Sequence, residues 1–381
     1  MSRVSPSWQG ARSEAGYVDA DWKAGKLKPL ADGAGHTLTL YTDFGRPSIP
    51  PERLIRASLI QILFSVRSER QLMEQMEYNL LFRWFVGLGI DDPVWVPTVF
   101  TKNRDRLLTT EMSRKVMAAI LDHREVAPLL SDDHFSVDGT LVKAWASMKS
   151  FQPTASDTPP DDGSGSPPRP DTYREDHAEP TEPETIPMTH SSRQNRNAEV
   201  DFRGEKRSNT THASTTDPEA RLYKKSPSTG AMLCFIGHAL MENRSGLIVQ
   251  GDLTRADGHA ERRAALDMIN RHSPGSSRRL TLGADKGFDA AQFVADLRQA
   301  CVTPHVAQKS RYSVIDGRTT WHGGYALSIK HRNRIEEAFG WAKTIGSMAQ
   351  AVYRGVERVR SRFILTMAAN NLARLPRLLA A

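Results

Sequence analysis

Arg279-Leu-Thr-Leu-Gly-Ala-Asp285 is an apolar run that ends in an acid. A short apolar run of this kind, bounded by polar residues, is typical of a buried β-strand. Residues 289–301 follow with apolar groups at helical spacing, and Val302 to Val306 forms a second short apolar run. Strand, helix and strand in succession predict an α/β arrangement around a shared sheet.

The segments around this unit extend the same layout. Residues 135–142 alternate in polarity and then turn, which predicts a strand that carries Asp138. Two further strands are expected at Met232–Met241 and Leu247–Leu253, joined by a turn at 243–246. Helices are expected at 257–271, 329–345 and 356–379. The predicted fold is therefore α/β, a mixed sheet flanked by helices.

The N-terminal third has a different character. Residues 1–47 are rich in Gly, Ser and charge, and we expect a flexible arm there. Residues 48–130 show helical spacing, and a helix capped by Thr98 exposes three basic side chains: Lys102, Arg104 and Arg106. A short basic helix after two apolar ones is typical of a helix-turn-helix DNA-binding domain. An ordinary helical bundle with a charged face fits the same periodicity equally well.

The remaining residues, 131–381, are expected to form one domain with an insertion. Residues 152–221 are rich in Pro, Ser, Thr, Asp and Glu and contain few large apolar groups. Such a segment buries too little apolar surface to offset its ordering entropy, so we expect disorder there.

Charge points to a polyanionic partner. The net charge is +7 and the pI is near 9.4. Ten Lys and Arg residues stand against three glutamates between Lys330 and Arg377, so the basic charge is concentrated locally. No run of eighteen apolar residues and no secretory signal occurs, which predicts no membrane association. Cys234 and Cys301 lie in apolar segments and are expected to be reduced core residues of a cytosolic protein.

Three carboxylates stand where acids are otherwise unfavourable. Asp138 and Asp285 end apolar strand runs, which is where α/β sheets place their active groups. Taken singly, each aspartate also fits a turn or a helix cap. On the helix at 329–345, Glu336 shares a stripe roughly 40° wide with Arg332 and Lys343, whereas Glu337 points elsewhere. A simple ion pair between Arg332 and Glu336 would explain part of that stripe.

Carboxylates on separate elements suit phosphodiester chemistry. Two divalent ions roughly 3.5–4 Å apart can activate the attacking oxygen and stabilise the departing one. Mg²⁺ prefers oxygen ligands, and Mn²⁺ is the possible substitute. We therefore expect Asp138, Asp285 and Glu336 to be both the catalytic and the metal-binding residues. Arg332 and Lys343 would hold phosphate oxygens of DNA beside them.

Several segments, in the same order along the chain, resemble the DDE transposases of the insertion sequence 5 (IS4/IS5-like) group. They are Asp-Gly-Thr-Leu-Val-Lys-Ala-Trp-Ala-Ser (138–147), Gly-His-Ala-Leu-Met-Glu-Asn-Arg-Ser-Gly-Leu (237–247), Ala-Asp-Lys-Gly-Phe (284–288) and Arg-Ile-Glu-Glu-Ala-Phe-Gly-Trp-Ala-Lys (334–343). Arg332, Glu336 and Lys343 meet the family spacing of Arg, three residues, Glu, six residues, Lys. The family tyrosine three residues before the arginine is Ile329 here, and Tyr325 is the nearest tyrosine.

The resemblance implies a ribonuclease H-like catalytic domain that acts on the terminal inverted repeats of an insertion sequence. Water would nick the DNA, and the freed 3′ hydroxyl would attack target DNA. It also implies double-stranded DNA as the partner, a homodimer or larger assembly, and a place in the bacterial cytoplasm at the nucleoid. Two alternatives stay open: a non-catalytic DNA-binding protein derived from a transposase, and a ribonuclease H-like nuclease that cuts without joining.

Overall fold

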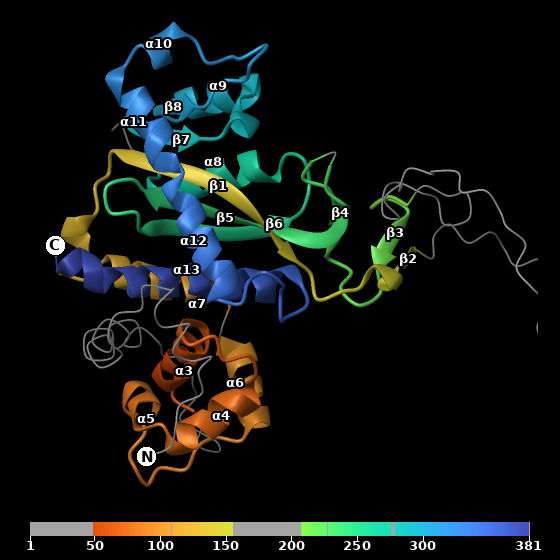
Figure 1. The fold of residues 1–381 in the computed structure, drawn as a ribbon, viewed down its shortest axis with the longest axis vertical. Coiled ribbons are helices and arrows are strands. Elements are labelled where there is room, and N and C mark those ends of the chain that lie inside the picture. Colours follow the sequence, from red (N-terminus) through yellow and green to blue (C-terminus); the bar gives the residue numbers. More distant parts are fainter. Residues whose placement is uncertain (1–48, 108, 155–206, 227, 276–278, 381) are drawn as a thin grey trace, which may run out of the picture.

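The structure, a computed structural model, describes residues 49–107, 109–154, 207–226, 228–275 and 279–380 (Figure 1). The arm expected over residues 1–47 lies outside these ranges, as does most of the insertion expected over 152–221. Within the described ranges, no helix has both the length and the apolar character needed to cross a membrane.

The centre of the protein is a mixed sheet. Its main strands are β1 (His134–Lys143), β5 (Met232–Glu242), β6 (Ile248–Arg255), β7 (Leu280–Ala284) and β8 (Val302–Val306). They lie in the order β6-β5-β1-β7-β8, and β5 runs opposite to the others. The short strand β4 (Arg221–Tyr223) pairs with the start of β5. This is the ribonuclease H-like topology, so the predicted fold class is confirmed.

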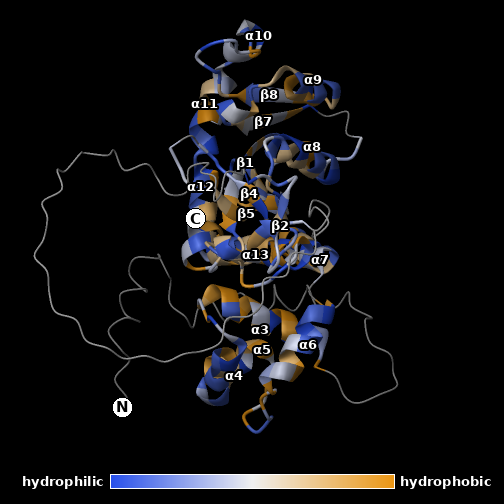
Figure 2. Ribbon diagram, turned by 90° about the vertical axis from the view of Figure 1, so that its right-hand side faces the viewer, coloured by the Kyte–Doolittle hydropathy of each residue, from blue (hydrophilic) through white to orange (hydrophobic). Residues whose placement is uncertain are grey.

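Helices cover both faces of the sheet (Figures 1 and 2). On one face lie α8 (Ala260–His272) and α9 (Ala291–Gln299). On the other lie α11 (Gly323–Arg332), α12 (Arg334–Thr344) and α13 (Val356–Leu379), with the short α10 (Gly317–Thr320) beside β8. Close packing is visible at Gly237 of β5, where an added Cβ would lie 2.5 Å from the ring of Phe363 on α13. The helix α13 is therefore packed tightly against the sheet at this point.

In the part of the chain that the structure describes, five α-helices precede the sheet. They are α3 (Pro51–Leu63), α4 (Glu69–Tyr78), α5 (Leu80–Val86), α6 (Pro97–Leu107) and α7 (Thr110–Leu121). The helix α3 is buried along most of its length, and it packs on α4, α5, α6 and α13. The helix α7 lies along α13 and β6. Ser113 of α7 and Ser361 of α13 share a hydrogen bond of 2.8 Å between their hydroxyls. Thus α13 contacts both the sheet and the N-terminal helices.

The end of the expected insertion is folded. The strand β2 (Phe151–Pro153) pairs with β3 (His212–Ser214), and β4 begins at Arg221. The disorder predicted for residues 207–221 is therefore wrong. Serine and threonine side chains explain why: Ser150 and Ser214 bond to each other at 2.8 Å, which satisfies polar groups that the composition alone marks as unfavourable for burial.

The structure confirms one of the expected element bounds and corrects several other details. The last helix begins and ends as predicted, at Val356 and Leu379. The single helix expected at 329–345 is interrupted at Asn333, which separates α11 from α12. Asp138 lies in the middle of β1 rather than at its end. Cys301 is exposed, not a core residue, because it follows α9 with a positive φ of 59° and turns away from the interior.

Candidate active site

Two of the three predicted acids lie side by side. The strands β1 and β7 pair in parallel only from His134 to Ser136, where Ser136 is opposite Gly283. Asp138 and Asp285 each lie two residues beyond this last paired position, and the charge of Asp285 acts on the Asp138 carboxyl, so the two side chains are close to each other. Beyond residue 136, β1 has no partner on its β7 side among the described strands. The two aspartates therefore stand where the sheet opens.

The negative charge at this opening is only partly balanced. Burial raises the pKa of the half-buried Asp138 above its usual value, and the neighbouring Asp285 carboxylate acts in the same direction. The Gly139 N–H, which donates to Asp138 Oδ1 at 2.7 Å, and the charges of Lys225 and Arg332 oppose this shift. Asp285 forms an ion pair with Arg332, with Nη2 3.4 Å from Oδ1. A cation placed here would be attracted by two adjacent carboxylates.

Glu336 and Glu337 face different surroundings. Glu337 bonds to Arg374 of α13 at 3.2 Å. Glu336 is exposed at the start of α12, in sequence between Arg332, which pairs with Asp285, and Lys343. Among the described residues, no hydrogen bond or ion pair is formed by the Glu336 side chain, and no three His, Cys, Asp or Glu side chains are placed to hold a metal ion together. The structure thus brings two of the predicted acids together and does not group the third with them.

Lys343 lies in the last turn of α12, which Asn333 separates from the helix that carries Arg332. Burial lowers the pKa of Lys343, and the positive charge of Lys225 lowers it further. Lys225 also acts on Asp138 and is itself exposed. Two lysines and Arg332 therefore border the aspartates from one side, as a phosphate-binding rim would require.

A fourth acid, Glu261, lies close to the two aspartates. Its side chain is half-buried in the first turn of α8 and lies against Gly139 of β1. A Cβ at Gly139 would be 2.6 Å from Glu261 Oε1, so a larger residue there would displace this carboxylate. Burial raises the pKa of Glu261, as do the charges of Asp138 and Asp285, while Lys225 opposes them. The signal present in the sequence is the glycine that follows Asp138.

The basic helix of the N-terminal region is α6. Lys102 and Arg106 are exposed on it, as expected. The exposure expected for Arg104 is wrong, because Arg104 shares the buried face of α6 with Phe100 and Leu107 at i, i+4 and i+7 spacing. Its guanidinium pairs with Glu69 and Asp105 and lies 4.6 Å from the centroid of the Tyr353 ring. Arg104 therefore joins α6 to α4 and to the segment before α13.

Tyr325, the nearest tyrosine to the family position, has a packing role in this structure. Its hydroxyl donates to the Val306 carbonyl at 3.0 Å, and its ring meets that of His305 edge-on. The side chain is directed at β8 rather than at the aspartates.

Two family models match the chain. A transposase domain (DUF772) matches residues 23–106, and a transposase DDE domain matches residues 211–372. Together they cover more than half of the chain, in the order in which the helical region and the sheet occur. The chain belongs to the DDE transposases of the IS4/IS5-like kind. The DDE model covers Asp285, Glu336 and Glu261, whereas Asp138 lies before its first matched residue.

Other comparisons add little to this assignment. One solved structure, "Crystal structure of the Mos1 mariner paired end complex with Mn", is 12% identical to this DDE transposase. It covers 89% of this chain and 81% of that chain at a TM-score of 0.20, which is too low to support an argument. No curated protein sequence matches the chain.

Proposed function

We propose that this transposase binds the terminal inverted repeats of an insertion sequence and cuts and joins DNA with Asp138, Asp285 and Glu336. The observation that carries the proposal is the pair Asp138 and Asp285 on neighbouring strands at the open part of the sheet. Two adjacent carboxylates repel each other and destabilise the fold, which is typical of a functional site.

The residues suit a divalent metal ion. Asp138 and Asp285 offer only hard oxygen donors. Burial makes the negative charge of Asp138 unfavourable, and a bound cation would offset that cost. Asp138, Asp285 and Glu336 would hold two Mg²⁺ ions, with Mn²⁺ as an alternative. When bound, these ions would supply Lewis acidity at the attacking and departing oxygens of the phosphodiester. Glu336 would have to turn toward the aspartates, which its lack of other partners among the described residues permits.

The chain's own side chains would position the DNA. Arg332 and Lys343 would bind the oxygens of the reacting phosphate, since both lie on the rim beside the aspartates. In the first step a water oxygen attacks phosphorus and the bond to the 3′ oxygen breaks, leaving a 3′ hydroxyl. In the second step that hydroxyl attacks a phosphodiester of the target DNA, and a bond of equal type breaks there. In each step the reacting phosphate must be held in the same position relative to the catalytic acids.

The helices at residues 48–130 would form the DNA-binding domain, and 131–381 the catalytic domain. Lys102 and Arg106 are exposed on one helix and would contact the DNA. Arg104 would support them from the interior of the helical region. Two copies of the chain would pair the two ends of the element.

The test is cleavage of labelled element-end DNA by the purified protein, in Mg²⁺ or in EDTA. The expected result is metal-dependent nicking at the element boundary, absent in Asp285→Ala, which should still bind the DNA. Tight binding without cleavage in any divalent metal would contradict the proposal and identify a non-catalytic DNA-binding protein instead. Cleavage without subsequent joining to a target would identify a nuclease.

A further inference from the structure

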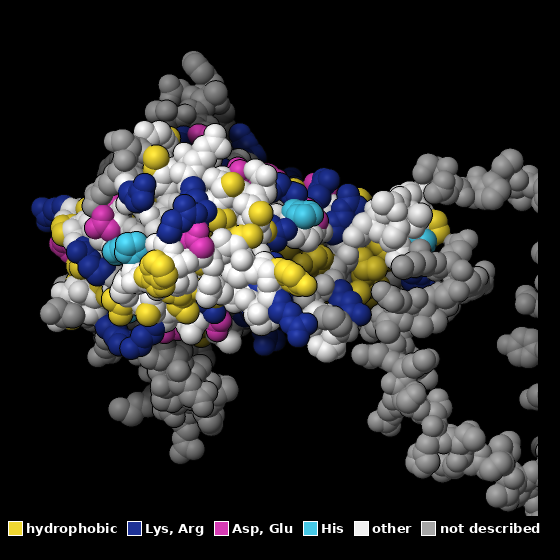
Figure 3. All heavy atoms as spheres, turned by 90° about the horizontal axis from the view of Figure 1, so that it is seen from above, with side chains coloured by type: hydrophobic (Ala, Val, Ile, Leu, Met, Phe, Trp, Pro, Cys, Tyr) yellow, Lys and Arg dark blue, Asp and Glu magenta, His cyan; other side chains and the backbone are white. Residues whose placement is uncertain are grey.

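A second basic site lies at the β8 end of the sheet, which Figure 3 shows from above with Lys and Arg side chains spread over it. A cleft of about 540 Å³ opens there, between the starts of β7 and β8 and the helix α10. Its lining residues are Arg279, Thr281, Arg298, Cys301, Val302, Thr303, Pro304, His305, Arg318, Thr319 and His322. None of them is acidic. A cleft of this size accommodates a ligand of about one nucleotide.

The arginines give the cleft a net positive charge. Asp316 pairs with both Arg298 and Arg318, at 3.7 Å and 2.6 Å, and so balances only one of them. Arg279 is exposed and has no ion pair among the described residues. His305 adds no charge at neutral pH, because burial lowers its pKa to about 4 and its Nδ1 bonds to Ser328 Oγ. The positive charge therefore comes from guanidinium groups, which suit phosphate oxygens.

An exposed aromatic ring lies at the rim. Trp321 stands in the sequence between Thr319 and His322, which both line the cleft. One side of its ring rests on Gly317, where an added Cβ would lie 2.8 Å from the ring atoms. The side chain is nevertheless 87% exposed. A ring that is supported on one face and open on the other provides a stacking surface for a nucleobase.

The cleft is distinct from the active site but shares its face of the sheet. Thr281 lines the cleft, and Thr281, Gly283 and Asp285 point to the same side of β7. The four residue-to-residue steps from Thr281 to Asp285 span about 13 Å. The helix α11 lies between the two sites, since a Cβ at Gly283 would be 3.4 Å from the Ser328 carbonyl. A DNA strand would reach the cleft by passing over α11, where Lys330 is exposed.

We propose that this cleft binds one nucleotide of an unpaired DNA strand, with Arg279 and Arg318 on the phosphate and Trp321 on the base. The inference rests on the proposed function, because cleavage at an element end supplies strands of this kind. A duplex is too wide to enter a cleft of this volume, and free inorganic phosphate would leave Trp321 without a role.

Cys301 provides a direct probe in the native protein. The sequence contains two cysteines, Cys301 lines the cleft and is exposed, and Cys234 is buried with its pKa raised to about 12 by burial. Alkylation by iodoacetamide should therefore modify Cys301 selectively. We expect a single-stranded oligodeoxythymidine to slow that reaction at least tenfold, and a blunt duplex or inorganic phosphate to slow it little. An unchanged alkylation rate at a saturating concentration of the strand would overturn the proposal.

Variants then separate the cleft from the active site. Arg279→Gln with Arg318→Gln should lower the salt dependence of single-strand binding by about 0.7 in log–log slope for each phosphate that the protein no longer binds. Trp321→Ala should weaken the binding of the strand and leave that slope unchanged. The matched control is Arg255→Gln, which removes an exposed arginine that pairs with Glu219, and it should change neither quantity.

The outcomes also distinguish this inference from the proposed function. If the unmodified protein cleaves element-end DNA but the double arginine variant keeps the full salt slope, only the cleft inference is wrong. If the unmodified protein neither binds nor cleaves DNA, the proposed function itself is wrong.

Discussion

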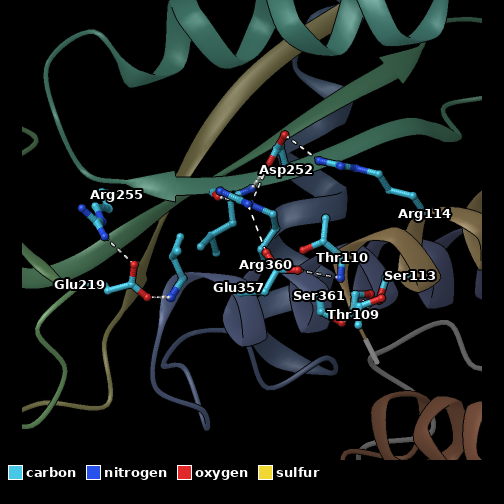
Figure 4. Close-up of polar contacts among 12 residues, drawn as sticks. Thr109, Thr110, Ser113, Arg114, Glu219, Asp252, Arg255, Glu357, Arg360 and Ser361 are labelled. Carbon is cyan, nitrogen blue, oxygen red and sulfur yellow. Dashed lines mark hydrogen bonds and ion pairs between the residues drawn. The ribbon is translucent and has the colours of Figure 1, made fainter. Parts of the chain in front are cut away.

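Two aspartates on the same sheet have opposite surroundings: one is paired with arginines, and the other lies near a second carboxylate. Asp252 of β6 is buried and forms ion pairs with three arginines: Arg114 at 3.1 Å, Arg271 at 2.7 Å and Arg360 at 3.0 Å. Figure 4 shows the pairs with Arg114 and Arg360. These arginines come from α7, α8 and α13, so one carboxylate ties three helices to the strand. Asp138 of β1 is also largely enclosed, yet the hydrogen bond that it receives among the described residues comes from the adjacent Gly139 N–H.

The difference distinguishes Asp252, which holds the fold together, from Asp138, which we propose to be functional. A buried carboxylate with several charged donors stabilises its neighbours, and removing it leaves uncompensated positive charge. A buried carboxylate beside another carboxylate costs stability, which the protein retains only where a ligand or a reaction needs the charge. Substitutions at these and neighbouring residues test the contrast, beginning with the largest effect.

Asp138→Asn should abolish activity and stabilise the protein. We expect strand cleavage to fall by roughly three orders of magnitude or more, since a catalytic group is removed. Because the folded-state pKa of Asp138 is raised, its ionisation opposes folding above the carboxyl range. The variant should therefore melt at a higher temperature than the parent at pH 7 in EDTA. That gain should vanish as the pH falls below the unfolded-state pKa of an aspartate. Thermal melts at both pH values, with cleavage assays, check this, and a lower melting temperature at pH 7 would contradict it.

Glu336→Gln and Glu337→Gln form a matched pair of adjacent changes. Glu336→Gln should remove cleavage nearly as fully as loss of an aspartate, while DNA binding persists. Glu337→Gln weakens a surface ion pair with Arg374, which is worth less than about 1 kcal/mol, and should cleave at near-normal rates. If the two variants lost cleavage activity equally in a gel-based assay, Glu336 would be no more important for cleavage than Glu337.

Asp252→Asn should show the reverse of Asp138→Asn. Three arginines would be left without their shared negative charge, and since each is partly exposed we expect a loss of about 2–3 kcal/mol in the free energy of unfolding. Cleavage per folded molecule should change little. Denaturant titration measures the first quantity, and a stability equal to that of the parent would show that the arginines are satisfied by solvent.

Glu261→Gln should reduce cleavage about tenfold, because it removes a carboxylate that borders the aspartates without touching DNA. The concentration of Mg²⁺ needed for half-maximal cleavage should rise in parallel. Gly139→Ala should act in the same way by displacing the Glu261 carboxylate. In a Glu261→Ala background, Gly139→Ala should have a much smaller effect, and a double-mutant cycle measures this coupling. Additive effects would disprove the contact.

Lys343→Ala is expected to have the smallest effect. The variant would bind one phosphate fewer, so the salt slope of duplex binding should fall by about one unit while the protein remains folded. The control is Lys115→Ala, which removes an exposed lysine that pairs with Glu111 on α7. Fluorescence anisotropy over a range of salt concentrations checks both, and equal slopes for the two variants would remove Lys343 from the DNA interface.

The sheet and its helices were predictable because their signals are local. Apolar runs at 280–284 and 302–306 and the helical spacing after Val356 require no knowledge of distant contacts. The folded part of the insertion was not predictable in this way. Its strands are three residues long, and they are held by pairing and hydroxyl contacts with segments far away in the sequence.

The candidate site was likewise predictable only where its signals are local in the sequence. The resemblance and the spacing of Arg332, Glu336 and Lys343 indicated the three acids, but not that Asp138 lies in mid-strand beside an open edge. Glu261 could not be identified from its own segment because its position depends on the missing side chain of Gly139, which lies on another element. Arg104 was misjudged for a different reason. It was expected to be exposed because it is charged. Its i, i+4 and i+7 spacing nevertheless places it on the same helix face as Phe100 and Leu107.

The pairing of β2 with β3 gives this transposase a ready attachment point for a foreign domain. The Thr154 N–H donates to the Thr211 carbonyl at 2.9 Å, so the β2–β3 pairing holds these two residues beside each other. Because that pairing already holds Thr154 and Thr211 together, doubling the number of residues between them would cost only about 0.6 kcal/mol of closure entropy. A fluorescent or affinity domain spliced between residues 155 and 206 should therefore leave the sheet intact, which makes live imaging of assembly on DNA feasible without altering either terminus.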